Sequence, residues 1–266
     1  MKISIGFSPC PNDTFIFDSL VNGGIDSEGL EFNILMEDVQ TLNLWALEGR
    51  LDVSKISYGV WPMVTDRYTL LESGSALGRG VGPLLIGNKA NYLSSPDDMA
   101  VAIPGRNTTA HLLFSMAYPD AANKLFLRYD EIEDFVISGK GLGVIIHENR
   151  FTYESKGLKK IVDLGDYWEK ETGTPIPLGG IVARRDLEKD IITKIDRMIR
   201  QSIEISFTRY PELSDFIRSN AQEMEESVMR KHIDLYVNEY SLQLGEVGHK
   251  AIKTLEEVFN ETEKRD

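Results

Sequence analysis

The chain has 266 residues, 42% of them hydrophobic and 27% charged, which is typical of a globular protein with a sizeable core. Its formal net charge of −13, with no run rich in lysine or arginine, argues against a nucleic-acid partner. Cys10 is the only cysteine, so the chain cannot form an internal disulfide. No apolar stretch approaches the ~20 residues that span a bilayer, and Met1 leads directly into a strand pattern. We therefore expect a cytoplasmic protein without membrane insertion.

The first 57 residues alternate between strand patterns and helix patterns. Alternating apolar and polar residues predict strands, and apolar residues at helical spacing predict amphipathic helices. The expected strands are 2–8, 30–37 and 51–57, and the expected helices are 13–23 and 38–50. This β-α-β-α-β order predicts a parallel sheet with helices on its faces.

The middle of the chain repeats this order, and the end of the chain is helical. Further strands are expected at 68–74, 82–88, 99–105, 124–130, 142–148 and 177–185. Helices are expected at 108–118 and 131–139, and after the last strand at 186–209, 211–220, 222–243 and 246–263. In the first of these late helices, Ile195, Ile199 and Ile203 belong to a stripe that is typical of core packing.

Two βαβ-rich units followed by a helical tail predict an α/β fold with two lobes. Segments 82–99 and 170–180 are the expected crossovers between the lobes. We therefore expect a discontinuous first lobe of residues 1–88 and 178–266, and a second lobe of residues 89–177. Two crossovers place a cleft between the lobes, where a small ligand can bind.

The stretch FSPCPNDTFIF (7–17) joins the first strand to the first helix. Asn12, Asp13 and Thr14 are residue types that cap helices, so the helix is expected to begin near them. Its first N–H groups would favour an anion in the cleft, with Asn12 and Thr14 as candidate substrate contacts. A capped helix without a ligand is the simpler alternative. Cys10 is a weak candidate for a nucleophile, because no histidine stands near it in the sequence.

The stretch IPGRNTTAHLL (103–113) repeats this arrangement in the second unit. Thr108 or Thr109 is expected to cap the next helix, and the N–H groups of Thr109 and Ala110 are candidates for holding a carboxylate. Here too, a plain capping motif is the alternative. In the strand LDVSKIS, Lys55 is either a cationic contact or a solvated side chain, and Ser57 either faces the cleft or starts the next helix.

His147 follows a strongly β-forming segment in GKGLGVIIHENR (139–150), which places it at the end of a strand. A neutral imidazole at such a position can act as a general base near pH 7. The alternative is a partly buried histidine with a structural role. Glu148 is a candidate for orienting the imidazole, although neighbours on a strand point to opposite faces.

The sequence offers no sign of a metal or a dinucleotide cofactor. The histidines lack the spacing of a zinc site, and no HExxH motif occurs. The glycines at 78, 80 and 82 lack the third glycine at Rossmann spacing, and a strand rather than a helix follows them. We therefore expect neither a zinc site nor a dinucleotide-binding site.

Several segments together resemble one enzyme family, the 1,4-dihydroxy-6-naphthoate synthases of the futalosine route to menaquinone. They spread in order over nearly the whole chain: FSPCPNDTFIF, ALEGRLDVSKISY, SGSALGRGVGPLL, IPGRNTTAHLL, GVIIHENRFTY, LGGIVARRDL and YVNEYSLQLGEVG. The resemblance implies a fold similar to type 2 periplasmic binding proteins. It also implies a lyase that cleaves cyclic dehypoxanthine futalosine, a small carboxylate, without a cofactor. The residues that match the family's site motifs are His147 as the base, and Lys55, Ile56, Ser57, Thr109 and Ala110 as substrate contacts.

Two other functions fit the same fold. A solute-binding protein for transport is disfavoured, because the start of the chain shows neither a signal peptide nor a lipobox-like cysteine. Chorismate dehydratase, a sister activity of the pathway, is disfavoured by the complete SPCPNDTF and IIHE motifs. The sequence predicts no particular oligomeric state.

Overall fold

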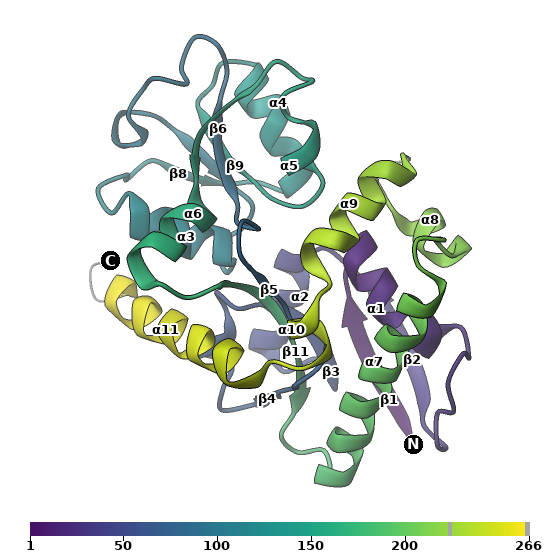
Figure 1. Cartoon of the computed structure of the whole chain (residues 1–266). Coiled ribbons are helices and arrows are strands. Elements are labelled where there is room, and N and C mark those ends of the chain that lie inside the picture. Colours follow the sequence, from purple (N-terminus) through teal and green to yellow (C-terminus); the bar gives the residue numbers. More distant parts are fainter. Residues whose placement is uncertain (223–224, 264–266) are drawn as a thin grey trace.

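The computed structural model describes residues 1–222 and 225–263, which form two lobes, each built around its own β-sheet (Figure 1). Within the described residues, the first sheet has six strands in the order β2-β1-β3-β11-β4, with β5 beside β11. The second has five strands in the order β10-β6-β9-β7-β8. The predicted two-lobed α/β fold is therefore confirmed.

The first sheet is made by β1 (Lys2–Phe7), β2 (Glu31–Met36), β3 (Val53–Ser57), β4 (Tyr68–Leu70), β5 (Ala76–Gly78) and β11 (Ile176–Arg184). Strand β1 pairs in parallel with β2 and β3, as the sequence pattern predicts. Its alternate residues Ile3, Ile5 and Phe7 are fully buried, because successive side chains on a strand point to opposite faces. Strand β11 returns from the second lobe and runs antiparallel to β3, so the sheet is mixed rather than purely parallel.

The second sheet is made by β6 (Leu84–Gly87), β7 (Val101–Ile103), β8 (Lys124–Phe126), β9 (Leu142–Ile145) and β10 (Lys159–Asp163). Strand β7 is parallel to β8 and β9, whereas β6 and β10 are antiparallel to their neighbours. The sequence analysis missed β10 and the helix after it, α6 (Leu164–Thr172). Asp163 caps that helix by accepting hydrogen bonds from the N–H groups of Gly165 and Asp166.

Helices cover both sheets and form the end of the chain. They are α1 (Pro11–Val21), α2 (Val39–Glu48), α3 (Thr109–Ala117), α4 (Ile132–Ile137), α5 (Asn149–Thr152), α7 (Lys189–Arg209), α8 (Asp215–Asn220), α9 (Glu226–Tyr236), α10 (Glu239–Leu242) and α11 (Gly245–Glu263). Short 3₁₀ turns are η1 (Trp61–Met63), η2 (Pro96–Asp98) and η3 (Tyr129–Glu131). The stripe on α7 is buried at Ile195, Ile199 and Ile203, as predicted.

Most predicted elements differ by a few residues from those in the structure, and three of these differences concern the site or the helical end of the chain. Helix α1 begins at Pro11, before the expected start at 13, and strand β9 ends at Ile145, before His147. The single helix expected at 222–243 is instead α9 and α10, because the backbone is extended at Val237 and Asn238. Residues 223–224 of that prediction lie outside the described residues.

The predicted division of the chain into lobes stays a proposal, and sheet pairing suggests an adjustment. Strand β6 lies before the expected boundary at 88, yet it pairs with β9 and β10 of the second sheet. Strand β11 begins at Ile176, two residues before the expected return at 178, and it belongs to the first sheet. We therefore place the crossovers at residues 79–83 and 173–175.

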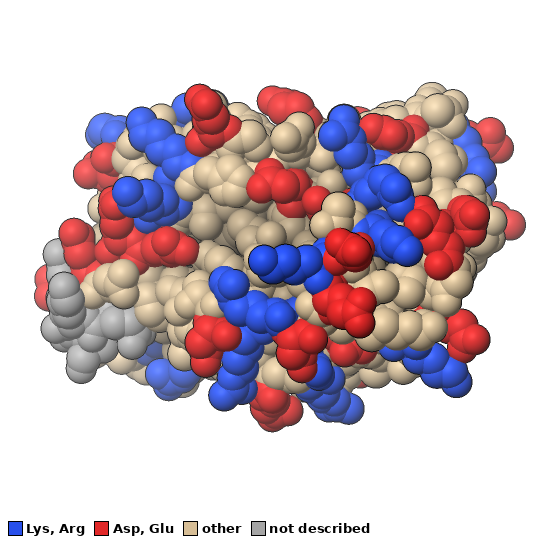
Figure 2. All heavy atoms as spheres, turned by 90° about the horizontal axis from the view of Figure 1, so that it is seen from below, with Lys and Arg blue, Asp and Glu red and all other residues tan. Residues whose placement is uncertain are grey.

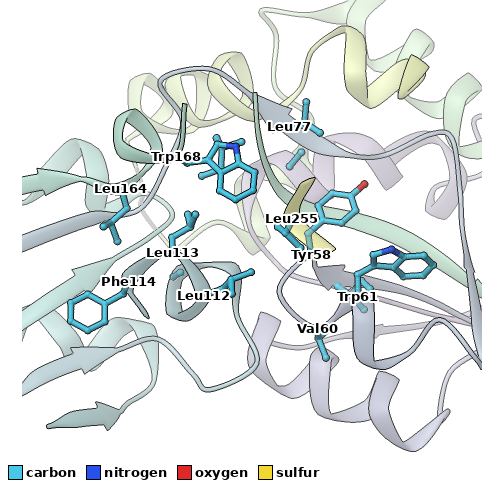
Figure 3. Close-up of a cluster of buried hydrophobic side chains, with 14 of the residues drawn as sticks. Tyr58, Val60, Trp61, Leu77, Leu112, Leu113, Phe114, Leu164, Trp168 and Leu255 are labelled. Atoms are coloured by element: carbon cyan, nitrogen blue, oxygen red, sulfur yellow. The ribbon is translucent and has the colours of Figure 1, made fainter. Parts of the chain in front are cut away.

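The two lobes share one hydrophobic cluster at their junction (Figure 3). Trp168 of α6 and Leu113 of α3 come from the second lobe, and Tyr58 and Trp61 come from the first. Leu255 of α11 joins the same cluster, and α11 packs against both α3 and β11. The C-terminal helix therefore braces the two lobes against each other.

Figure 2 shows Lys and Arg side chains interspersed with Asp and Glu side chains, with uncharged areas between them. This mixed charge agrees with the low expectation of a nucleic-acid partner. Among the described residues, no helix has both the length and the apolar character needed to cross a membrane. The expected cytoplasmic location stays a prediction.

Candidate active site

A pocket lies between the two lobes and contains about 730 Å³ of space outside protein atoms, part of it open to solvent. That size is ordinary for a small-molecule site. Its lining includes these residues that the sequence analysis selected: Asn12, Lys55, Ile56, Ser57, Thr109, Ala110 and His147. Thr14 is the selected residue that does not line it, because its hydroxyl donates back to the carbonyl of Cys10 at 3.1 Å.

The start of α1 differs from the predicted capping arrangement. Cys10 occupies the N-cap position without a side-chain hydrogen bond, and Pro11 is the first helical residue. Asn12, Asp13 and Thr14 therefore lie in the first turn rather than at the cap, because proline is well suited to start a helix. Asn12 donates to Asp13 Oδ1 at 2.9 Å, and its own oxygen lies 2.9 Å from Nε2 of His232.

Lys55 and Asp13 form a buried ion pair beneath the pocket. The Lys55 ammonium lies 3.1 Å from Asp13 Oδ1 and donates to the carbonyl of Gly74 at 2.8 Å. Asp13 also accepts hydrogen bonds from the backbone and hydroxyl of Ser8. Asp13 thus compensates the lysine charge, and one of the three ammonium donors is left over for a ligand.

The N-terminus of α3 enters the pocket from the second lobe. Thr108 caps the helix by accepting from the N–H of His111 at 3.2 Å. The Thr109 hydroxyl donates to the carbonyl of Leu178 at 2.9 Å and accepts from Gly59 N at 3.0 Å. Because that hydroxyl is already engaged, the backbone N–H groups at the helix start are the donors left for an anion.

Gly59 and Ser57 fit closely around this helix start. A Cβ atom at Gly59 would lie 2.5 Å from the carbonyl carbon of Thr108 and 2.6 Å from the nitrogen of Thr109. Ser57 Oγ accepts from Asn43 Nδ2 at 3.1 Å, which leaves the Ser57 hydroxyl hydrogen for a ligand. The sequence analysis missed Asn43, which is fully buried and also donates to the carbonyl of Asn107 at 2.7 Å.

His147 lies in the turn between β9 and α5 and has a left-handed backbone, with φ of 57°. Its ring contacts Tyr129 edge to face at a centroid distance of 5.1 Å and lies parallel to the ring of His232 at 6.1 Å. Its Nδ1 lies 3.6 Å from Sγ of Cys10. Burial lowers the pKa of His147, against an opposing effect of Glu148, so the imidazole is neutral at pH 7.

Three buried side chains lie near His147: His232, Cys10 and Glu148. Burial lowers the pKa of His232 to about 3 and raises the pKa of the Cys10 thiol well above its usual range, so neither is charged at pH 7. Glu148 is 2% exposed, and its Oε1 lies 3.9 Å from Nδ1 of His232. Neither of these two atoms has a hydrogen-bond partner among the described residues.

Donor atoms of Cys10, His147 and Glu148 lie within 4.8 Å of one another, which is the spacing that a metal ion needs. A metal would have to displace the proton of the Cys10 thiol, and burial raises the pKa of that thiol, which weakens metal binding near neutral pH. The expectation that no metal is bound here stays a prediction. Sequence spacing alone could not reveal this group, since Cys10 is far from the other two residues along the chain.

Comparison with known proteins supplies the family. A family model described as menaquinone biosynthesis matches residues 3–261. A 1,4-dihydroxy-6-naphthoate synthase of Thermus thermophilus is 46% identical over 264 residues, which cover 99% of this chain and 94% of the relative. The chain belongs to the 1,4-dihydroxy-6-naphthoate synthase family. A second synthase of this name, from Streptomyces coelicolor, is 39% identical over 259 residues. The match covers 95% of this chain and 91% of the Streptomyces synthase.

The family membership makes the chain an enzyme of menaquinone biosynthesis and confirms the resemblance noted in its motifs. Among solved structures, protein AF1704 of Archaeoglobus fulgidus superimposes on this synthase-family chain with a TM-score of 0.92. It is 29% identical, and the match covers 99% of this chain and 98% of AF1704. The periplasmic aliphatic sulphonate binding protein SsuA of Escherichia coli matches with a TM-score of 0.61 at 11% identity, over 99% and 88% of the two chains. At that identity the likeness shows the fold alone, and it confirms the predicted binding-protein fold.

Proposed function

We propose that this protein is a lyase that converts cyclic dehypoxanthine futalosine to 1,4-dihydroxy-6-naphthoate, with His147 as the general base. The observation that carries the proposal is a neutral imidazole in the wall of a pocket that also contains the start of α3. A base must be unprotonated to act, and a helix start attracts a carboxylate. The substrate of the reaction has both features that this pair requires, a carboxylate and a removable proton beside a carbonyl.

The two nitrogens of His147 have different surroundings. Nδ1 faces the Cys10 sulfur at 3.6 Å, and no described residue hydrogen-bonds to Nε2. With the hydrogen of Nδ1 directed at sulfur, Nε2 carries the lone pair and is the nitrogen that takes the proton. The electron pair of the broken C–H bond forms an enolate with the carbonyl. When the carbonyl re-forms, a double bond forms to the β-carbon, and the group on that carbon leaves with the electron pair of its bond, while His147 holds the proton as imidazolium.

The substrate carboxylate is placed at the start of α3 in this proposal. The N–H groups of Thr109 and Ala110, the Ser57 hydroxyl and the spare donor of Lys55 surround that position. Ile56 and Leu178 supply apolar walls for the aromatic ring. Proton abstraction by a side chain, followed by elimination, calls for no cofactor.

The test is to add cyclic dehypoxanthine futalosine to the purified protein and follow the naphthoate product by absorbance and mass. We expect catalytic turnover, with product exceeding the enzyme concentration. Parallel incubation with chorismate separates the sister activity, since dehydration of chorismate without naphthoate formation would replace the proposed reaction. Binding of either compound without any product would instead support a solute-binding protein on the same fold.

A further inference from the structure

Resting on the function proposed above, we infer that the sugar half of the substrate binds in a second, polar pocket on the other side of His147. This second pocket contains about 600 Å³ of space outside protein atoms, part of it open to solvent. Its lining includes Glu37, Asp38, Arg128, Tyr129 and His147. His147 lines the first pocket as well, so its ring stands at the junction of the two.

The first pocket is mainly apolar and the second is mainly polar, as are the aromatic half and the sugar half of the substrate. The first pocket has apolar walls from Leu42, Val81, Ile146 and other aliphatic residues, which suit an aromatic ring. Most of the side chains that line the second pocket are polar, and those of Glu37, Asp38, Arg128 and Tyr129 suit a ring that carries several hydroxyls. The bonds that join the two product fragments therefore lie beside the imidazole.

Besides the amide of Gln222, the carboxylate of Glu37 and the hydroxyl of Tyr129 are available for sugar hydroxyls in the second pocket. Asp38 is already engaged as the cap of α2, and Arg128 is paired with Asp130. The Glu37 carboxylate and the Tyr129 hydroxyl have no hydrogen-bond partner among the described residues, and the only hydrogen bond of Glu37 runs from its backbone N–H to the carbonyl of Phe7. A carboxylate accepts hydrogen bonds from hydroxyls, and burial raises the pKa of Tyr129, so its hydroxyl remains a donor.

Tyr129 also connects the two parts of the site. Its ring is 9% exposed and contacts the His147 ring edge to face at a centroid distance of 5.1 Å. A sugar in hydrogen-bond contact with the Tyr129 hydroxyl is thus held next to the base. Glu37, which is exposed at the end of β2, faces the same pocket from the first lobe.

The experiment compares substrate with product in the variants Glu37→Gln and Tyr129→Phe. Neither change removes a hydrogen bond or an ion pair between described residues, and phenylalanine keeps the ring contact with His147, so both variants should fold. The KM for cyclic dehypoxanthine futalosine should rise about 3- to 30-fold with little change in kcat, as expected when a hydrogen bond to a bound ligand is lost. The dissociation constant of 1,4-dihydroxy-6-naphthoate, which lacks the sugar half, should stay unchanged.

Two controls make the comparison specific. Glu31→Gln changes another exposed carboxylate of β2 outside both pockets and should leave KM unchanged. Ser57→Ala, in the first pocket, should weaken the binding of both the substrate and the naphthoate. The inference is overturned if Glu37→Gln and Tyr129→Phe leave KM unchanged. It is also overturned if they weaken the binding of the naphthoate as much as the binding of the substrate. No turnover by the unchanged protein would overturn the proposed function and this inference together.

Discussion

Sγ of Cys10 lies 3.6 Å from Nδ1 of His147, although 137 positions separate the two residues in the chain. The contact joins the loop after β1 of the first lobe to the turn after β9 of the second lobe. The single cysteine therefore lies on the Nδ1 side of the proposed base, where it lines the second pocket, and not beside Nε2, which takes the proton in the proposed reaction. Its position suggests orientation of the imidazole rather than attack on the substrate.

Replacing Cys10 by alanine tests that role. The thiol is protonated because burial raises its pKa, so we expect it to orient His147 without forming a bond to substrate. Loss of one weak hydrogen bond should lower kcat by about 3- to 10-fold, and Cys10→Ser should retain more activity. Rate measurements and intact-protein mass during turnover check this. A covalent adduct on Cys10 in the unchanged protein would show that it is a nucleophile instead.

The ion pair of Lys55 with Asp13 should matter strongly for stability. Both side chains are buried, at 6% and 3% exposure, so Lys55→Met leaves a buried carboxylate without its cation. We expect the free energy of unfolding to fall by about 3–5 kcal/mol, measured by urea denaturation.

Two further variants make the ion-pair test sharper. The double variant Lys55→Met with Asp13→Asn should recover part of the loss, because the uncompensated charge is then gone. Arg200→Met breaks the exposed pair of Arg200 with Glu204 and should change stability by less than about 1 kcal/mol. Equal losses for Lys55→Met and Arg200→Met would contradict the buried-pair interpretation.

Arg150 holds the turn that carries His147. Its guanidinium donates to Gly80 O at 2.9 Å, to Gly82 O, and to Asp163 Oδ2 at 2.7 Å. The left-handed backbone of His147 is unfavourable for a residue with a Cβ atom and needs such support. Arg150→Met should therefore misplace the base and lower kcat by about 10- to 100-fold, with a smaller effect on KM.

The matched control for this variant is Arg79→Met. Arg79 lies in the crossover 79–83, to which Arg150 donates two hydrogen bonds, and pairs with Glu169, but its own hydrogen bonds do not reach the turn of His147. Steady-state kinetics of the two variants should differ mainly in kcat. If Arg150→Met keeps the kcat of the unchanged protein, the turn does not depend on this arginine.

Burial of His232 should make folding sensitive to acid. Its pKa is lowered from 6.5 to about 3 because burial disfavours the charged imidazolium. Between these two pH values the unfolded chain binds a proton that the folded chain does not, so stability falls as pH falls through this window, by up to about 1.4 kcal/mol per pH unit. Above pH 6.5 the contribution is constant.

The variant His232→Gln should remove this sensitivity while keeping a polar group beside Asn12. We expect a shallower fall in unfolding free energy between pH 6 and pH 4 than in the unchanged protein, measured by denaturant titration at each pH. The same slope in both proteins would show that His232 titrates normally. A direct NMR titration of the His232 ring would then reveal its actual pKa.

Local patterns predicted most of the fold because they depend on nearby residues. The alternation in β1 and the stripe on α7 match buried positions such as Ile5 and Ile199. Strand β10 begins with two lysines, Lys159 and Lys160, so its pattern is hidden at its exposed end. The predicted start of α1 was wrong because it relied on the capping residues Asn12, Asp13 and Thr14. The helix begins instead at Pro11, since proline is favoured at the first helical position.

The sequence predicted only those residues of the candidate site that belong to a recognisable motif. His147, Thr109 and Ala110 stood in recognisable segments, and the structure brings them to one pocket. Cys10 also stood in such a segment, but the contacts of Cys10 and His232 with His147 had no signal in the sequence, because they result from the folding of three distant segments. Contacts of this kind have no local pattern, so only the folded chain could reveal them.

The central claim is that His147 removes a proton from the substrate, and the rate of His147→Gln tests it most directly. Glutamine keeps a polar side chain of similar reach but cannot serve as a base. Naphthoate formation from cyclic dehypoxanthine futalosine should fall by about 10²- to 10⁴-fold, with the variant still folded and still binding naphthoate. Product formation at the rate of the unchanged protein would contradict the account.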